Sequence, residues 1–276
     1  PFPRLAAHAF TDEHLANLVE LVRTILAGGE ADGVVITHGT NTLEETAWLL
    51  HLTVAGDAPI VVTGAMRPAS ALSADGPLNL VDAVRLASAP AAAGLGVVVV
   101  MDGTIHGARD VTKANTLRVD AFASPMAGPL GRVDGDGRVV ITSRPARAAS
   151  LRGAYAGVNL RALSRVDVVA SYQGADGALI DAAVAAGARG IVSAGTGAGY
   201  PTPLEVEALG RASASGVVIA QSSRVGSGRV PPVPALLARG WVAADDLAPW
   251  KARILLRLAL AAGEDLDTIR SRFAAP

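Results

Sequence analysis

Thr40 carries a hydroxyl that could act as a nucleophile, in a loop between a predicted strand and a predicted helix. It follows the apolar run Val34–Thr37 and precedes a segment with helical periodicity, so its side chain should stand at a helix N terminus. Unpaired backbone N–H groups at such a terminus favour an anion or a developing negative charge. Simple capping of the helix by Thr40 and Thr42 explains the same residues without any reaction, so this loop alone leaves both interpretations open.

Lys113 is the second candidate for chemistry. The chain has 24 lysines and arginines, of which only Lys113 and Lys251 are lysines. Arginine is effectively always protonated, whereas a desolvated lysine can lose its proton and act as a base. A lysine in so arginine-rich a sequence therefore suggests proton transfer. The alternative is an ordinary surface lysine, or one that pairs with the nearby Asp110.

The surrounding sequence predicts a sheet that brings such loops together. Short apolar runs alternate with longer segments of helical periodicity, which is typical of parallel strands covered by helices on both faces. Ligands bind beyond the carboxyl ends of the strands in such sheets. The loops that should converge on a site are therefore those after Thr37, Thr63, Met101 and Ala194.

Two α/β domains are expected. The first has Thr11 and Asp12 as the N-cap of its first helix, and Thr42 and Glu45 with the spacing of a capping box before its second. We predict a larger N-terminal domain over 1–143, with a doubly wound, mostly parallel sheet, a connection over 144–164, and a smaller C-terminal α/β domain over 165–276. The predicted strands are 34–37, 60–63, 95–101, 166–172, 190–194 and 217–222, and the predicted helices are 12–27, 43–54, 78–87, 178–186, 204–214, 248–262 and 264–274.

Composition limits the classes of partner. Half of the 276 residues are apolar, 18% are charged, and the formal net charge is −1. Nothing in this balance indicates binding to nucleic acid or to an anionic membrane, and no apolar run reaches the roughly 18 residues of a transmembrane helix. The chain has no cysteine, which excludes disulfides, thiolate catalysis and cysteine-ligated metal. The expected partner is a small molecule or another protein.

Four motifs occur in order in the first half of the chain. They are GVVITHGTNTLEETA at 33–47, GAMRP at 64–68, SADGP at 73–77 and GARDVTKANT at 107–116. Three further segments follow: GIVSAG at 190–195, SSR at 222–224 and the helix of Lys251. Together the four motifs resemble the bacterial L-asparaginase/glutaminase family, and the further segments extend this resemblance over nearly the whole chain.

The resemblance implies hydrolysis of L-asparagine, and of L-glutamine in some members, without metal or organic cofactor. By motif, Thr40 is the threonine and Lys113 the lysine of a Thr-Lys-Asp set, in which Asn41 occupies the position of the acid. Gly39 is expected beside the substrate, and the backbone carbonyl of Ala65 near its amide. The resemblance also implies a homotetramer or homodimer, and we expect a cytoplasmic protein, with periplasmic or secreted locations left open.

Several positions depart from the family pattern. Asparagine at 41 cannot neutralise an ammonium group, so weaker binding, slower turnover or a changed substrate is expected. No Thr-Gly-Gly-Thr motif, which carries the family's first nucleophile, occurs in the sequence, and we interpret the chain as truncated before a first strand. Ala7-His8-Ala9 replaces a substrate-binding serine and its acidic or glutamine neighbour, and Ala198 replaces an asparagine that reaches a neighbouring subunit.

Other functions fit the sequence less well. Gly195, Gly197 and Gly199 have the wrong spacing for a dinucleotide-binding motif and are equally explained by a tight turn. No Gly-x-Ser-x-Gly elbow of a serine hydrolase occurs, and the five histidines lack zinc-site spacing. The remaining alternative is an impaired or inactive asparaginase-like protein that binds a small amino acid or serves as an assembly subunit.

Overall fold

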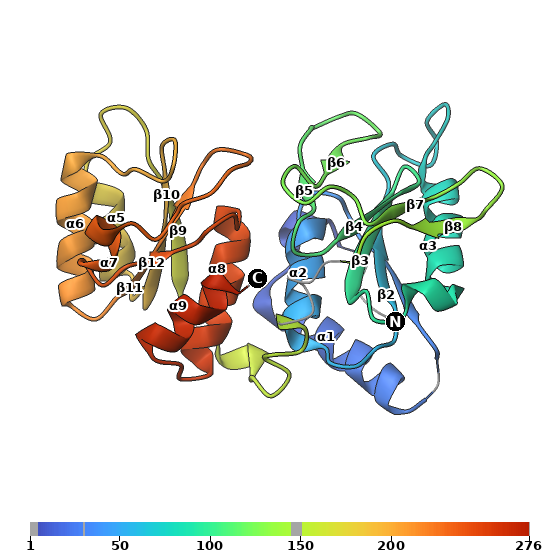
Figure 1. Ribbon diagram of the computed structural model, residues 1–276, viewed down its shortest axis with the longest axis horizontal. Helices are drawn as coiled ribbons and strands as arrows, with labels where there is room; N and C mark the ends of the chain where they lie inside the picture. Colours follow the sequence, from blue (N-terminus) through green and yellow to red (C-terminus); the bar gives the residue numbers. More distant parts are fainter. Residues whose placement is uncertain (1–4, 30, 145–150, 276) are drawn as a thin grey trace. The chain divides into compact units, whose positions relative to one another are not determined.

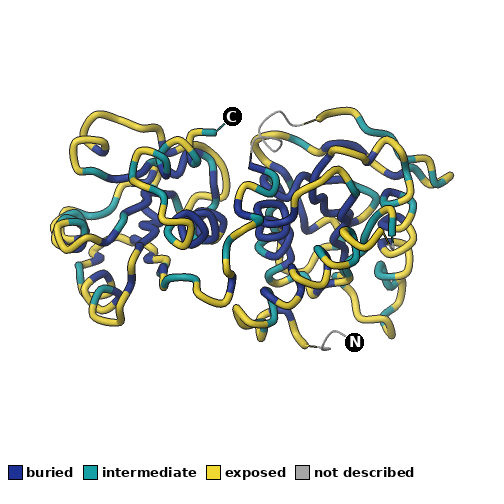
Figure 2. The backbone as a smooth tube through the Cα atoms, turned by 90° about the horizontal axis from the view of Figure 1, so that it is seen from below, coloured by how far each residue is buried: buried dark blue, intermediate teal, exposed yellow. Residues whose placement is uncertain are grey.

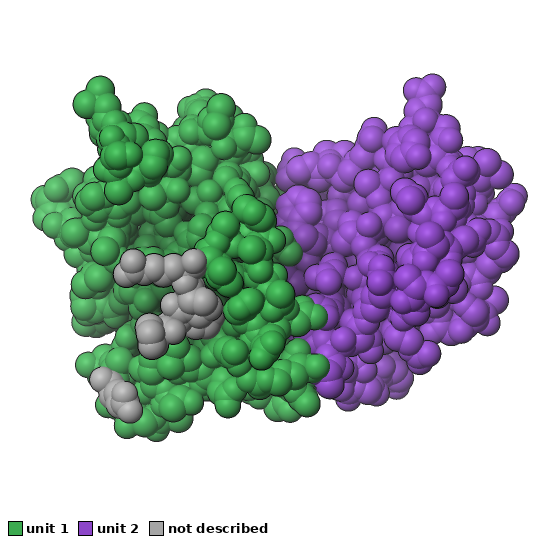
Figure 3. All heavy atoms as spheres, turned by 180° about the vertical axis from the view of Figure 1, so that it is seen from behind, with its two compact units in different colours: residues 1–161, 276 green, residues 162–275 purple. Residues whose placement is uncertain are grey.

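The computed structural model describes residues 5–29, 31–144 and 151–275. The chain divides between Arg161 and Ala162 into two compact units, which Figure 3 colours separately. This division lies within the predicted connection over 144–164, of which residues 145–150 are outside the described residues. Tyr155 is buried in the first unit, where its N–H donates to the carbonyl of Leu52 at 2.9 Å.

A six-stranded sheet forms the centre of the first unit, in the order β1-β2-β3-β4-β7-β8. Strands β1 to β3 are parallel, and the remaining pairs are antiparallel. Because β1 and β2 are parallel neighbours, the loops after them leave from the same edge. The strands are β1 (Val34–Thr37), β2 (Ile60–Thr63), β3 (Val97–Met101), β4 (Thr104–Gly107), β7 (Gly131–Val133) and β8 (Val139–Ile141).

Helices cover both faces of this sheet (Figure 1). Helix α2 (Leu43–Thr53) packs on one face with α1 (Asp12–Ala27) beside it, and α3 (Gly76–Ser88) packs on the other. Every α2 residue except Glu45 is buried, so this helix is a core element rather than a surface one. Figure 2 shows the buried backbone gathered inside each unit. The core residues between α3 and the sheet include Val61, Ala83, Leu86, Val98, Val100 and Ile105.

A small antiparallel ribbon follows β4. It consists of β5 (Thr112–Lys113) and β6 (Phe122–Ala123), with Lys113 opposite Phe122. The described residues also form three short 3₁₀ helices, η1 (Ala7–Ala9), η2 (Pro90–Ala92) and η3 (Leu160–Ala162).

The second unit contains a four-stranded parallel sheet in the order β12-β11-β10-β9. Helices α5 and α6 lie on one face, and α8 and α9 lie on the other (Figure 1). Its elements are β9 (Val166–Ala170), α5 (Ala178–Ala185), β10 (Gly190–Gly195), α6 (Pro203–Ala214), β11 (Val218–Ser223), α7 (Pro234–Leu237), β12 (Val242–Ala243), α8 (Pro249–Ala261) and α9 (Leu266–Ala274).

The predicted α/β class with two sheets is confirmed, and the main elements agree with the predicted ranges to within two or three residues. Strands β4 to β8, α7 and β12 were not predicted. The capping box predicted for Thr42 and Glu45 is wrong, because the Thr42 hydroxyl donates to the carbonyl of Ala7 at 3.1 Å instead. Thr11 does cap α1, in a capping box completed by His14. None of the described helices has the length and apolarity that crossing a membrane requires.

Candidate active site

The loop after β1 and the strand β5 meet at Thr40 and Lys113. The Lys113 Nζ donates to the Thr40 Oγ1 at 2.8 Å, although 73 residues separate them in the sequence. Both residues are partly buried. Asp110, the alternative partner of the lysine, instead lies 3.5 Å from the Arg109 guanidinium. The structure therefore brings the two sequence-predicted reactive groups into direct contact.

His38 fixes the path of the loop that carries Thr40. Its Nδ1 lies 2.7 Å from the Gly39 carbonyl and its Nε2 lies 3.0 Å from the Thr46 Oγ1. A carbonyl only accepts, so Nδ1 carries the hydrogen, and in the neutral ring Nε2 accepts from the Thr46 hydroxyl. Burial lowers the pKa of His38, and the hydrogen bond to Gly39 opposes this shift only in part. The ring is thus kept neutral and anchors the loop to α2.

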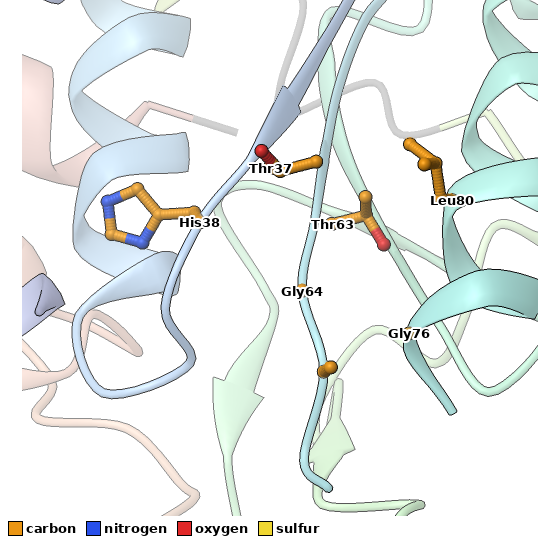
Figure 4. Close-up of a pocket in the computed structure, with 7 residues that line it drawn as sticks. Thr37, His38, Thr63, Gly64, Gly76 and Leu80 are labelled. Atoms are coloured by element: carbon orange, nitrogen blue, oxygen red, sulfur yellow. The ribbon is translucent and has the colours of Figure 1, made fainter. Parts of the chain in front are cut away.

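The loop after β2 lies against the loop after β1. A Cβ on Gly64 would come within 2.4 Å of the His38 carbonyl oxygen and 3.3 Å of the Thr40 Cγ2, so only glycine permits this approach. The next residue, Ala65, is exposed. A pocket of about 310 Å³ lies beside these loops (Figure 4), and its lining residues are Thr37, His38, Thr63, Gly64, Ala65, Gly76 and Leu80. In Figure 4 the His38 ring lies on the α2 side, whereas Leu80 points from α3 towards the strands.

Asp75 and Asn79 hold the Ala65 loop in place. The Asp75 carboxylate accepts the N–H groups of Met66 and Arg67, each at 2.8 Å, and the Asn79 amide donates to the Gly64 carbonyl at 3.0 Å. Burial alone would raise the pKa of Asp75, but these two backbone hydrogen bonds, with help from Asn79, lower it overall. Sequence reasoning missed both residues. Their spacing of four at the start of α3, just after a loop rich in Gly, Pro and Ser, was the available signal.

Asn41 is exposed, and its neighbours come from the turn Ala7–Ala9. The Asn41 Nδ2 lies 3.5 Å from the His8 Nδ1, and a Cβ on Gly39 would come within 2.9 Å of the Ala7 Cβ. The segment Ala7-His8-Ala9 therefore does lie beside the loop of Thr40. In the described part of the chain, no carboxylate forms a hydrogen bond or ion pair with the side chain of Asn41 or with the Lys113 Nζ.

The glycines of the second unit form a tight turn. A Cβ on Gly195 would lie 2.2 Å from the Gly199 backbone, and Gly197 and Gly199 both adopt positive φ. Helix α6 begins only at Pro203, capped by Thr202 and Glu205, so the glycines do not form the start of a helix. Across residues 5–29, 31–144 and 151–275 there is no group of three or more His, Cys, Asp or Glu side chains that could hold a metal ion.

Comparisons with known proteins cover both units. The family described as Asparaginase, N-terminal matches residues 2–147, and the Glutaminase/Asparaginase C-terminal domain matches residues 165–273. The L-asparaginase 2 of Bacillus subtilis is 41% identical over 259 residues, which are 94% of this chain and 68% of that protein. A glutaminase-asparaginase of Pseudomonas fluorescens biotype A is 37% identical over 279 residues, or 98% of this chain and 75% of that protein.

A solved structure gives the same result for the fold. The crystal structure described as the "Probable Cytoplasmic L-asparaginase" from Campylobacter jejuni superposes with a TM-score of 0.94 and 38% sequence identity. The match covers 100% of this chain and 90% of that chain. With family matches over both units and relatives of this identity, the chain belongs to the asparaginase family of amidohydrolases.

Proposed function

We propose that the chain hydrolyses the side-chain amide of L-asparagine to the acid and ammonia, with L-glutamine as a second substrate. Family membership supports amide hydrolysis, and the two relatives are named for asparaginase and glutaminase-asparaginase activity. The observation that carries the proposal is the contact of 2.8 Å between the Lys113 Nζ and the Thr40 Oγ1. It pairs a hydroxyl with a cationic side chain that, unlike arginine, can lose its proton and act as a base.

The proposed reaction uses Lys113 in its neutral form. The lysine nitrogen takes a proton from the Thr40 hydroxyl, or from a water through Thr40, and the resulting oxygen attacks the amide carbon. The C–N bond then breaks, and the nitrogen leaves as ammonia with the transferred proton. When a water attacks, the acid forms directly. When Thr40 attacks, an ester forms on its Oγ1; a water then attacks the ester carbon, its proton passes through Lys113 back to Oγ1, and the C–O bond breaks to release the acid and regenerate Thr40. Either route consumes one water for each amide that is converted to an acid. The contact of 2.8 Å between Nζ and Oγ1 is close enough for this proton transfer.

Substrate binding is assigned to the loops on either side of this pair. Gly39 and Asn41 flank Thr40, and the exposed Ala65 offers its carbonyl from the neighbouring loop. Asn41 can hydrogen-bond the substrate's α-ammonium group through its amide oxygen but contributes no negative charge. We therefore propose binding that is weaker than an aspartate at this position would give.

The test is ammonia release from L-asparagine, L-glutamine and their D-enantiomers. We expect release from L-asparagine, slower release from L-glutamine, and the least from the D-forms, because the site is chiral. Saturable binding of L-asparagine without ammonia from any substrate would contradict hydrolysis and would favour an inactive amino-acid-binding protein.

We further propose a cytoplasmic homotetramer or homodimer. The cytoplasmic assignment is supported by the description of the Campylobacter jejuni structure, and the oligomer by the resemblance on which the site assignment rests.

A further inference from the structure

Glu44 is a buried acid that touches the backbone of the proposed catalytic lysine. It lies in the first turn of α2 and is only 6% exposed. Its Oε1 accepts the Lys113 backbone N–H at 3.1 Å across 69 residues of sequence. Its Oε2 is buried and has no hydrogen-bond partner among the described residues.

This contact is one of two between the same pair of segments. Thr40 receives the tip of the Lys113 side chain, and Glu44, four residues later, receives the N–H at its base. The lysine is therefore attached at both ends to the loop and first turn of α2. Two attachment points restrict the direction of a four-carbon side chain that otherwise has many rotamers.

The strand that carries Lys113 has only a short pairing partner, although Ala114 and Asn115 also donate to the Ala121 carbonyl. Strands β5 and β6 pair over only two residues each, and an isolated two-stranded ribbon is marginally stable. The register places Lys113 opposite Phe122, while the Lys113 N–H is used by Glu44. The hydrogen bond to Glu44 therefore ties this short ribbon to the buried helix α2.

Position 44 is buried, so a residue that served only to pack there would be expected to be apolar rather than a glutamate. Burying a carboxylate with one unpartnered oxygen costs stability, although the helix N terminus offsets part of this cost. Among the described residues, the only hydrogen bond of this carboxylate comes from the Lys113 N–H. The buried acid therefore stabilises the position of the lysine.

We infer that Glu44 is a positioning residue, which aligns Lys113 with Thr40 by holding the Lys113 backbone N–H. The inference rests on the proposed function for its kinetic consequences, but the hydrogen bond itself can be tested without activity. What matters in this arrangement is a hydrogen-bond acceptor at Oε1 rather than the negative charge. A glutamine, which keeps a carbonyl oxygen there, should therefore replace the glutamate in this role.

The experiment compares Glu44→Ala, Glu44→Gln and the control Glu45→Gln, which removes the same charge one residue later. Hydrogen exchange at the Lys113 amide is followed by NMR, together with kcat and KM for ammonia release. For Glu44→Ala we expect amide exchange to speed up at least about tenfold, and kcat to fall about 10- to 100-fold, while KM changes little. Glu44→Gln should keep slow exchange at the Lys113 amide and retain kcat within about threefold. A general loss of stability would not produce this difference between Glu44→Ala and Glu44→Gln.

Two results would overturn the inference: slow exchange with native kcat in Glu44→Ala, or a loss of kcat above about tenfold in Glu44→Gln while the Lys113 amide stays protected. Should Glu44→Ala fail to fold, the Glu44→Gln result decides alone. A chain without any amidase activity would remove the proposed function, yet faster exchange confined to Glu44→Ala would still establish the hydrogen bond as the support of Lys113.

Discussion

Lys113 is contacted by residues that are far away in the sequence. Its rarity as a lysine pointed to proton chemistry, and the motif around it indicated Thr40 as its partner. Glu44, Asp75 and Asn79 could not be found in this way, because they act through hydrogen bonds to backbone groups of other segments. Asp75 and Asn79 show a spacing of four at the start of α3, but neither that spacing nor the sequence around Glu44 identifies the backbone group that each side chain contacts.

Asn41 provides a prediction at the residue scale. Replacing it by aspartate adds a negative charge beside the bound α-ammonium, and charge-assisted hydrogen bonds are about twice as strong as neutral ones. We expect Asn41→Asp to raise kcat/KM for L-asparagine about five- to tenfold, measured as ammonia release.

The control for this change is Asn17→Asp, which adds the same charge at an exposed position on α1. It should leave kcat/KM unchanged. An unaltered or lower kcat/KM in Asn41→Asp would show that residue 41 does not contact the substrate's ammonium.

At the scale of elements, hydrophobic periodicity located the helices and the longer buried strands well. Strand β3 is a run of four valines and a methionine, and α6 has Pro, Thr and Glu at the positions of a helix start. The strands β5, β6 and β12 have two residues each, which is too short for any periodic signal. Thr42 shows the other limit, since a capping-box spacing was overridden by a tertiary hydrogen bond to Ala7.

His38 gives a prediction for the loop between β1 and α2. Burial lowers the pKa of His38 in the folded protein below 6.5, the ordinary value that the unfolded chain keeps. As the pH falls, the unfolded chain therefore takes up a proton before the folded protein does. The stabilisation is complete above pH 6.5 and is lost below it, by at most about 1.4 kcal/mol per pH unit for one proton.

Thermal unfolding between pH 8 and 5 tests this. The decrease in Tm on acidification should be smaller in His38→Gln than in the native protein, whereas His8→Gln, at an exposed histidine, should behave like the native protein. Equal pH dependence in the native protein and in His38→Gln would show that His38 is not held neutral by the fold.

At the scale of the whole molecule, the chain has almost no net charge and retains apolar side chains at its surface. Leu78, Leu80, Val81 and Val84 are all exposed on α3, and β1 is an edge strand of the sheet among the described residues. Contiguous exposed apolar side chains are typical of surfaces that associate.

We therefore predict an oligomer in solution, a tetramer or dimer of the 27.8 kDa chain. Light scattering coupled to size-exclusion chromatography measures this mass directly, and Leu80→Glu with Val84→Glu should shift it towards the monomer if α3 is part of the interface. A native protein that elutes as a monomer at micromolar concentration would contradict the prediction.

The central claim is that Lys113 acts as the base for Thr40 in amide hydrolysis, and Lys113→Met tests it most directly. Methionine keeps much of the side-chain length but cannot accept a proton. We predict that steady-state ammonia release from L-asparagine falls at least about 100-fold while Tm and circular dichroism stay native. Ammonia release at the native rate by a folded Lys113→Met protein would contradict the account.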